Sequence, residues 1–291
     1  MKSDNSLRLP DGRTLSYAEF GRPEGYPVLF FHGTPGSRLQ PLVFAEDSTL
    51  ARLGLRLIAP DRPGLGRSDF QPKRGFSDYP ADVVALANAL GVDRFAVLGG
   101  SGGGPYAVAC AVRMPERLSA VVIVSGGWPM NVPEAWENLA PSVRRTRILA
   151  SKGPFLLGLL QKLSWGTFKD SGDKTLAKFT AGMPAPDRAV LEQPGRLERA
   201  LKDMGEAMHQ GTRGAVWDMR LSVRDWDFHL DDVRMPLKLF HGEQDNNVPI
   251  ALVRKVMGAL PGAQLVAYKN EGHWSTPVNH LDEIAQALMA D

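Results

Sequence analysis

The stretch Val97-Leu98-Gly99-Gly100-Ser101-Gly102-Gly103-Gly104-Pro105 decides the fold of this chain. A β-prone run over residues 95–98 stops at small residues, and a helix-compatible run over residues 106–113 follows at once. A strand that turns directly into a helix at a G-x-S-x-G pattern holds its serine at a strained backbone angle, and glycines are needed where the chain segments pass closely. The pattern predicts a nucleophile elbow that exposes Ser101 at the carboxyl end of a sheet, beside the first amides of a helix.

Two other interpretations of this stretch are a plain glycine-rich connection and a nucleotide-binding loop. No Lys-Ser or Lys-Thr pair follows the glycines, which excludes a phosphate loop. G-x-S-x-G alone is a weak signal, so the rest of the chain must distinguish the elbow from the plain connection.

Strands and helices alternate on both sides of the elbow. A hairpin is predicted around Pro10-Asp11-Gly12-Arg13. Continuous apolar runs are typical of parallel strands that are covered on both faces. The pattern predicts an α/β fold with a mostly parallel eight-stranded sheet and helices on both faces. The strands are expected at residues 7–9, 14–20, 27–31, 55–60, 95–98, 121–124, 237–240 and 264–268, and the helices at about 39–53, 77–90, 106–113, 249–260 and 281–289.

The alternation stops between residues 127 and 232, where no convincing strand occurs. Apolar residues recur there at helical spacing, as in Phe155, Leu156, Leu159, Leu160 and Leu163, and Pro and Gly interrupt the segment repeatedly. We expect residues 1–126 and 233–291 to form the core domain and residues 127–232, called the insertion below, to form a set of short helices.

Composition limits the function classes. The chain has 291 residues and a net charge of +2, which favours neither nucleic acid nor a membrane as partner. Its single cysteine, Cys110, rules out an intramolecular disulfide and is expected to be a buried core thiol. The first ten residues are polar and no transmembrane run is found, so the cytoplasm is the expected location. The chain is expected to act as a monomer or a homodimer.

A serine nucleophile needs a base, and the base needs an orienting anion. Of the six histidines, His273 is the best general base because it directly follows the last predicted strand, where active groups of a parallel sheet gather. A histidine that caps a helix is the alternative. Asp245 follows another strand end and gives the chain order Ser, Asp, His. Glu243 is its nearest rival and is expected to face solvent instead.

The developing oxyanion of an acyl-transfer reaction needs hydrogen-bond donors. The amide of Gly102 directly follows the serine, and the amide of Thr34 lies in the loop after an earlier strand. Pro35 has no amide proton. His32 is therefore expected to brace this loop, and Asp61 and Asp69 are expected to brace the loop at residues 63–67.

The chain resembles the α/β-hydrolase family. Five motifs carry the resemblance in order and cover nearly the whole chain outside the insertion. The resemblance implies a Ser-His-Asp triad, no metal, no organic cofactor and a helical cap formed by the insertion. The motifs are His32-Gly33-Thr34-Pro35, Asp61-Arg62-Pro63-Gly64-Leu65-Gly66-Arg67-Ser68, the elbow at residues 99–103, His241-Gly242-Glu243-Gln244-Asp245 with Val248-Pro249, and Gly272-His273.

Departures from known branches of the family limit the reactions that this chain is expected to catalyse. Epoxide hydrolases and haloalkane dehalogenases carry an aspartate where this chain has Ser101, and epoxide hydrolases use cap tyrosines. All five tyrosines of this chain lie outside the insertion. Proline iminopeptidases usually have a tryptophan after the serine, whereas this chain has Gly102.

The main functional hypothesis is a carboxylesterase-like serine hydrolase that cleaves an apolar acyl substrate without a cofactor. The alternatives are a lactonase, an amidase or peptidase, a carbon–carbon bond hydrolase of a diketone, and a non-catalytic relative that binds a small ligand. Apolar side chains in or beside the insertion are candidates for the pocket, although packing within the cap is the competing role for each. The candidates are Trp128, Met130, Trp136, Phe155, Trp165, Phe168 and, next to the histidine, Trp274.

Overall fold

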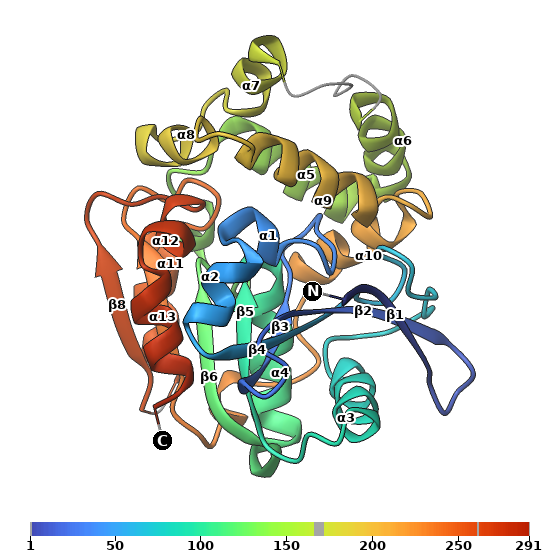
Figure 1. Cartoon of the computed structure of the whole chain (residues 1–291). Helices are drawn as coiled ribbons and strands as arrows, with labels where there is room; N and C mark the ends of the chain where they lie inside the picture. Colours follow the sequence, from blue (N-terminus) through green and yellow to red (C-terminus); the bar gives the residue numbers. More distant parts are fainter. Residues whose placement is uncertain (1, 166–171, 261, 291) are drawn as a thin grey trace.

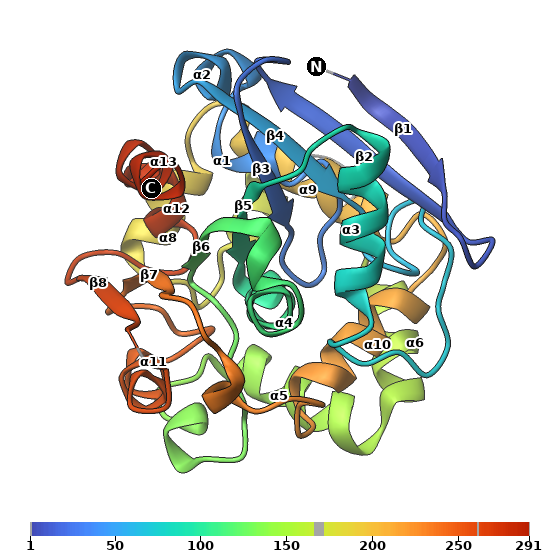
Figure 2. The same ribbon diagram turned by 90° about the horizontal axis from the view of Figure 1, so that it is seen from below.

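One eight-stranded sheet runs through the protein (Figures 1 and 2). The computed structural model describes residues 2–165, 172–260 and 262–290. The strand order is β1-β2-β4-β3-β5-β6-β7-β8, in which β2 is antiparallel to β1 and β4 and the other neighbours are parallel. This confirms the predicted sheet. The strands are β1 (Lys2–Arg8), β2 (Thr14–Gly21), β3 (Tyr26–Phe31), β4 (Leu55–Pro60), β5 (Phe95–Gly100), β6 (Leu118–Val124), β7 (Lys238–Gly242) and β8 (Gln264–Tyr268).

Helices cover both faces of the sheet (Figure 2). One face packs against α3 (Tyr79–Ala89), α4 (Gly104–Arg113) and α11 (Ile250–Met257). The opposite face packs against α2 (Asp47–Arg52) and α13 (Leu281–Leu288). Two layers of apolar side chains therefore hold the sheet between them.

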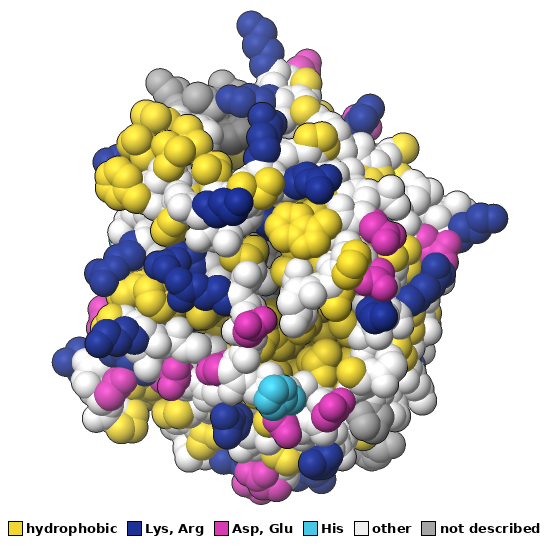
Figure 3. Space-filling view, turned by 180° about the vertical axis from the view of Figure 1, so that it is seen from behind, with side chains coloured by type: hydrophobic (Ala, Val, Ile, Leu, Met, Phe, Trp, Pro, Cys, Tyr) yellow, Lys and Arg dark blue, Asp and Glu magenta, His cyan; other side chains and the backbone are white. Residues whose placement is uncertain are grey.

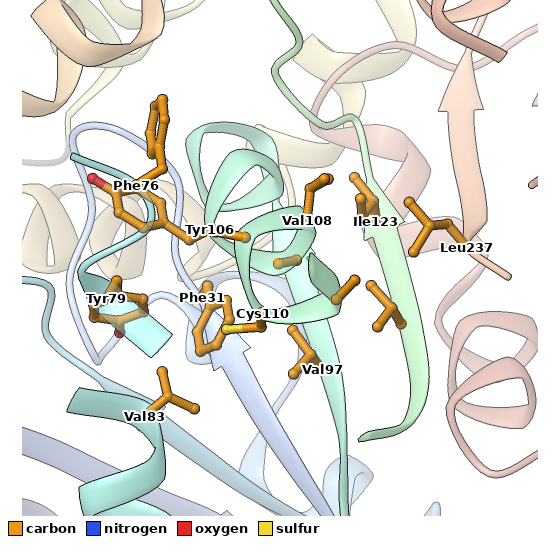
Figure 4. Packing of buried hydrophobic residues seen from close by; sticks show 14 of the residues in the cluster. Phe31, Phe76, Tyr79, Val83, Val97, Tyr106, Val108, Cys110, Ile123 and Leu237 are labelled. Atoms are coloured by element: carbon orange, nitrogen blue, oxygen red, sulfur yellow. The ribbon is translucent and has the colours of Figure 1, made fainter. Parts of the chain in front are cut away.

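Successive residues of the central strands point into these two layers alternately. In β5, Val97 belongs to the layer under α4, while Ala96 and Leu98 belong to the layer under α13. Figure 4 shows Val97 and Ile123 next to α4, with Cys110 pointing from that helix towards Phe31 of β3. Cys110 is a free, fully buried thiol, as predicted. Burial on both faces explains why these strands read as continuous apolar runs.

One helical prediction is corrected by the structure, and one helix was missed. The helix expected over residues 39–53 is divided into α1 (Pro41–Phe44) and α2, because Ala45 and Glu46 adopt extended backbone angles between them. Asp47 then accepts a hydrogen bond from the amide of Gly21 at 2.8 Å, which fixes the start of α2 on the edge of β2. A further short helix, α12 (Ser275–Asn279), directly follows His273 and was not predicted.

The insertion lies over the carboxyl ends of the parallel strands (Figure 1). Between β6 and β7 the described residues form helices and no strand, as the spacing of apolar residues indicates. None of the helices in the described ranges is both long and apolar enough to cross a bilayer. The elements are η3 (Pro133–Trp136), α5 (Pro141–Lys152), α6 (Pro154–Trp165), α7 (Asp173–Phe179), α8 (Ala185–Leu191), α9 (Arg196–Ala207), α10 (Arg213–Ser222) and η4 (Leu230–Asp232); outside the insertion, η1 (Ser101–Gly103) and η2 (Pro115–Arg117) flank α4.

Candidate active site

Ser101 stands at the bend between β5 and η1, with a φ of +49°. This is the left-handed region that side chains other than glycine rarely adopt. The bend is tight: a Cβ atom on Gly103 would lie 2.0 Å from the carbonyl oxygen of Phe31. Only glycine fits there, and the serine hydroxyl is consequently raised above the carboxyl end of β5.

The structure brings Ser101, His273 and Asp245 together in one hydrogen-bonded line. The Ser101 hydroxyl donates to Nε2 of His273 across 2.9 Å, and Nδ1–H of His273 donates to Oδ2 of Asp245 across 2.7 Å. The second oxygen of Asp245 accepts the amides of Asn247 and Val248, both at 2.8 Å. The carboxylate therefore fixes both the loop after β7 and the orientation of the imidazole.

Burial and mutual charge act in opposite directions on this pair. Burial alone would lower the pKa of His273, but the charge and hydrogen bond of Asp245 outweigh it and raise that pKa. Burial would raise the pKa of Asp245, but His273 outweighs it and the net pKa is lowered. A carboxylate that stays ionised beside a more basic imidazole suits a general base that must accept a proton from a hydroxyl.

The loop after β3 lies against the elbow. A Cβ atom on Gly102 would lie 2.4 Å from Oγ1 of Thr34 and 3.1 Å from its amide nitrogen, so the two predicted oxyanion residues are neighbours. In the described part of the chain, the Thr34 amide donates to no backbone acceptor. Arg62 stabilises this loop by donating to the carbonyls of His32 and Gly33 and to Thr34 Oγ1.

His32 is part of the same brace. Its Nδ1–H donates to the carbonyl of Gly33 at 2.9 Å, and its Nε2 accepts the amide of Arg62 at 3.2 Å. Burial holds the pKa of His32 well below its usual value, so the ring is neutral. These contacts agree with a bracing role and leave no ring nitrogen free for a reacting group.

The other carboxylates considered from the sequence contact residues other than Ser101 and His273. Glu243 is exposed and pairs with Arg254. Asp61 is buried and accepts the amides of Arg38 and Arg67, at 2.6 and 3.0 Å, which braces the loop after β4 as expected. Asp69 instead accepts the amide of Thr14 at 2.7 Å and ties the end of that loop to β2.

Asp187 of α8 is a site residue that the sequence analysis missed. It is almost fully buried, and its two oxygens accept the backbone amides of His273, Trp274 and Ser275 at 2.8–2.9 Å. A Cβ atom on Gly272 would lie 2.5 Å from this carboxylate. The insertion thus holds the backbone of the loop that carries the imidazole.

Two further buried aspartates of the insertion contact the other site loops. Asp203 of α9 accepts the amide and hydroxyl of Ser37 at 2.8 and 2.7 Å and the Gln40 side chain at 3.2 Å. Gln40 in turn accepts the amide of Gly33 at 2.6 Å. Burial raises the pKa of Asp203 to about 7, although the hydrogen bonds of Ser37 and Gln40 oppose the shift.

Asp218 of α10 pairs with two buried guanidinium groups. Arg62 approaches it at 2.7 Å, Arg74 also donates to it, and the Tyr106 hydroxyl donates across 2.8 Å. Burial would raise the pKa of Asp218, but the two arginines outweigh it and lower that pKa strongly. This ion-paired carboxylate links the insertion to the arginine that stabilises the Thr34 loop.

A cavity of about 490 Å³ lies between the serine and the insertion. Its wall is mostly apolar and comes from both regions. The core contributes Phe30, Leu98, Val124 and Ile284, and the insertion contributes Val143, Thr146, Ala150, Phe179, Met183, Met204 and Met219. Ser101, Thr34, Gly102, His273 and Trp274 also line it.

Of the side chains proposed for the pocket from the sequence, Trp274 lines this cavity and the other described ones do not. Trp128 and Met130 are buried in the core layer under α4, and Trp136 packs against the same layer. Phe155 is 87% exposed on α6, and Trp165 lies against Gly205 of α9. Phe168 lies outside the described residues. An apolar residue in a helical segment can face the core, the cavity or solvent, and the sequence does not say which.

Arg147 of α5 is the charged residue of the cavity wall without a carboxylate partner among the described residues. It donates to the carbonyls of Ala135 and Asn247, at 3.1 and 2.7 Å. Burial lowers its pKa to about 10. A guanidinium has five N–H groups, so these two bonds leave donors for an anion.

The described residues contain no group of three His, Cys, Asp or Glu side chains arranged to hold a metal ion. The chemistry that the site offers is that of its hydroxyl, imidazole, carboxylate and amide groups. Their arrangement fits nucleophilic acyl transfer.

Comparisons with known proteins agree with this geometry. Residues 26–279 match the family described as the alpha/beta hydrolase fold. The chain is 30% identical to a pimeloyl-[acyl-carrier protein] methyl ester esterase of Aromatoleum aromaticum, over 82% of this chain and 88% of the relative. It is 25% identical to a 2-hydroxy-6-oxononadienedioate/2-hydroxy-6-oxononatrienedioate hydrolase of Klebsiella pneumoniae, over 90% and 85%.

A solved structure shares the whole architecture. An alpha/beta hydrolase fold protein of Nakamurella multipartita superimposes with a TM-score of 0.69 at 24% identity, and the match covers 98% of this chain and 99% of that one. The family match spans most of the chain, from β3 through the helix after His273. The chain therefore belongs to the α/β-hydrolase fold family, and its established class is that of a hydrolase.

Proposed function

We propose that this protein is a serine hydrolase that cleaves carboxylic esters through an acyl-enzyme intermediate. The observation that carries the proposal is the line of hydrogen bonds from Ser101 through His273 to Asp245, at 2.9 and 2.7 Å, at the wall of a mostly apolar cavity. A nucleophile, a base and an orienting anion within hydrogen-bond reach are the geometric requirements of this chemistry.

In the first half-reaction Oγ of Ser101 attacks the ester carbonyl carbon while its proton moves to Nε2 of His273. The amides of Thr34 and Gly102 donate to the oxyanion of the tetrahedral intermediate. His273 then gives the proton to the departing alcohol. Asp245 stays ionised throughout and stabilises the imidazolium.

In the second half-reaction water attacks the acyl-enzyme. His273 accepts a proton from this water, the tetrahedral intermediate collapses, and Ser101 recovers its proton as the carboxylic acid leaves. The aromatic and methionine side chains of the cavity wall favour an apolar acyl or alcohol group. The methyl ester esterase among the relatives supports an ester as substrate.

The test is the hydrolysis of p-nitrophenyl esters of increasing acyl length by the wild-type protein and by Ser101→Ala. We expect turnover that falls by at least about 10³-fold in the variant, because only the oxyanion donors and substrate binding remain. Labelling of Ser101 by a fluorophosphonate without turnover of any ester would reject the esterase while keeping the nucleophile. Absence of both would leave a ligand-binding relative.

A second candidate is hydrolysis of a carbon–carbon bond in an anionic diketone on the same triad. Arg147 favours it, because a cation without a carboxylate partner at the cavity wall suits an acidic substrate. Relatives named as hydrolases of a dienedioate, which is a dicarboxylate, point the same way.

Arg147→Gln separates the two candidates, with the exposed Arg145→Gln as the matched control. If the substrate is anionic, kcat/KM for a 2-hydroxy-6-oxo-dienedioate exceeds that for neutral esters, and Arg147→Gln lowers it by about 10- to 100-fold. If the protein is an esterase for neutral acyl groups, the dienedioate is not turned over and the ester rates of the two variants agree.

A further inference from the structure

The outer face of the insertion carries an apolar patch. The large hydrophobic side chains that are exposed in the described residues all lie on α5 and α6. Phe155 is 87% exposed and Leu163 is 62% exposed, while in α6 only Leu157 is buried. We call the set the α5–α6 patch; its members are Ile148, Phe155, Leu156, Leu159, Leu160 and Leu163.

The members on α6 share one side of the helix. Phe155, Leu159 and Leu163 recur every four residues, and Leu156 and Leu160 form the adjacent row. Figure 3 shows hydrophobic side chains gathered on this part of the surface, with Lys and Arg side chains near them. A contiguous apolar surface of this kind, bordered by polar groups, marks an interaction site.

The charge of these two helices has a single sign. The sequence from Pro141 to Trp165 contains five basic residues and no Asp or Glu, in a chain whose net charge is only +2. Arg144, Arg145, Lys152 and Lys162 are exposed and form no ion pair with any described residue. The fifth, Arg147, points inward to the carbonyls of Ala135 and Asn247. In the ranges that the structure describes, four cations of α5 and α6 are thus left without an ion pair on the helices that carry the patch.

The helix α5 joins this surface to the cavity. Arg144, Ile148 and Lys152 are four residues apart and lie on its exposed side, with Arg145 beside them. Residues on its other side line the cavity that contains Ser101, namely Ser142, Val143, Thr146, Arg147 and Ala150. Whatever binds the outer side therefore lies one helix away from the candidate active site.

We infer that the α5–α6 patch binds the surface of an anionic lipid bilayer. Leucine and phenylalanine side chains insert among acyl chains while lysine and arginine contact acidic headgroups, which is the pattern of helices that lie in a membrane interface. A second copy of the chain fits less well. A symmetric dimer through this patch would bring the cations of both copies together, and neither helix carries an acidic residue to neutralise them.

The net charge of the whole chain, only +2, predicts no membrane partner. That sum averages the local charge of α5 and α6 with the acidic residues elsewhere. The proposal does not depend on the ester chemistry, since lipid binding is measured without turnover. If the proposed function also holds, the substrate would reach the cavity from the lipid surface past α5.

The test is flotation of the full-length protein with vesicles of equimolar phosphatidylglycerol and phosphatidylcholine, compared with phosphatidylcholine alone. We expect binding to the anionic vesicles that weakens as salt is added, because exposed charges are screened. Ser101→Ala should bind as the wild type does, which separates lipid binding from catalysis.

Two sets of substitutions test the apolar patch and the cations of the same helices separately. Phe155→Ser with Leu159→Ser and Leu163→Ser removes apolar surface, and changing Arg144, Arg145, Lys152 and Lys162 to Gln removes charge. Each set should weaken binding by at least about tenfold. The matched control changes four exposed cations elsewhere to Gln, namely Arg22, Lys73, Lys202 and Lys269, and should bind nearly as the wild type does.

Three results would overturn the inference: no binding of the folded wild type to anionic vesicles, equal losses in the patch and control variants, or a solution dimer that the serine substitutions dissociate without any lipid binding. Circular dichroism and thermal unfolding of each variant establish that it is folded. Because the serine and glutamine variants change only exposed positions, we expect their unfolding temperatures to stay close to that of the wild type.

Discussion

The sheet core and the insertion contribute to the same cavity in different ways. The core supplies the hydroxyl, the imidazole and the acid, each from a loop that follows a strand. The insertion supplies three buried aspartates that contact different parts of the core. Asp187 contacts the histidine loop and Asp203 contacts the loop after β3. Asp218 pairs with Arg62 and Arg74. In the proposed mechanism the core thus carries the reacting groups, and the insertion supports the loops around them.

This difference separates chemistry from positioning and can be tested residue by residue. Removing a core group should abolish a chemical step. Removing an insertion carboxylate should change stability, geometry or pH dependence while the chemical step remains.

The largest effect is expected for Asp245→Asn. An asparagine keeps the shape of the side chain but favours the wrong imidazole tautomer, so kcat should fall by about 10⁴-fold. The matched control is Glu243→Gln in the same loop, which is exposed and should leave kcat unchanged. Steady-state ester hydrolysis measures both, and equal losses would contradict the assignment of Asp245 as the anion.

Asp218→Asn should cost the most stability. It leaves Arg62 and Arg74 buried without their counter-charge, which typically costs about 3–5 kcal/mol of unfolding free energy. The contrasting core pair is Arg52 with Asp282, whose side chains are 63% and 65% exposed. Asp282→Asn should change stability by less than about 1 kcal/mol. Urea unfolding measures the free energy of unfolding of both variants. Equal values would contradict the role of Asp218 as the buried counter-charge.

Asp187→Asn should lower kcat by about 10- to 100-fold, because the backbone that carries His273 loses part of its support. The Asp187 charge also raises the pKa of His273. The acid limb of the kcat/KM profile reports the protonation of this base, so it should move to lower pH in the variant.

The control for this experiment is Asp173→Asn, which changes an exposed aspartate in the first turn of another insertion helix. It should keep both the rate and the acid limb of the wild type. A fall in kcat for Asp187→Asn with an unmoved acid limb would mean that the residue acts only through folding.

Asp203→Asn should have the smallest effect on the rate and should reveal itself through the pH dependence of stability. The folded chain raises the pKa of Asp203 from 3.8 to about 7, so it keeps a proton that the unfolded chain has already released. Raising the pH through this window therefore lowers the stability of the wild type. The stability of the wild type relative to the variant should fall between pH 4 and 7 and then level off, as thermal unfolding at several pH values would measure. A constant difference would contradict the shift.

The difference between the sheet core and the insertion also explains which features the sequence could predict. Strand-end motifs are local, so the elbow at Ser101 and the positions of Asp245 and His273 could be placed on the sheet before the structure was known. The sheet itself is confirmed, because strands buried on both faces read as apolar runs. The break at Ala45 and Glu46 was missed, since the hydrogen bond from Gly21 to Asp47 joins residues far apart in the chain.

The insertion was less predictable because its roles depend on packing between distant segments. Asp187 meets His273 across 86 positions in the sequence, and no local pattern marks it. The apolar spacing of α6 predicted a helix correctly, but helical spacing does not tell a buried face from an exposed one. Phe155 was therefore considered for the pocket and lies on the outer surface.

The backbone of Ser101 has a consequence for how selection acts on this chain. A residue with a side chain at a φ of +49° costs roughly 1–3 kcal/mol, which glycine would largely avoid. Ser101→Gly should therefore unfold at a higher temperature than Ser101→Ala, although both lack the nucleophile. Selection for stability alone would favour glycine at this position. The serine is retained only while selection for its hydroxyl outweighs this selection for stability.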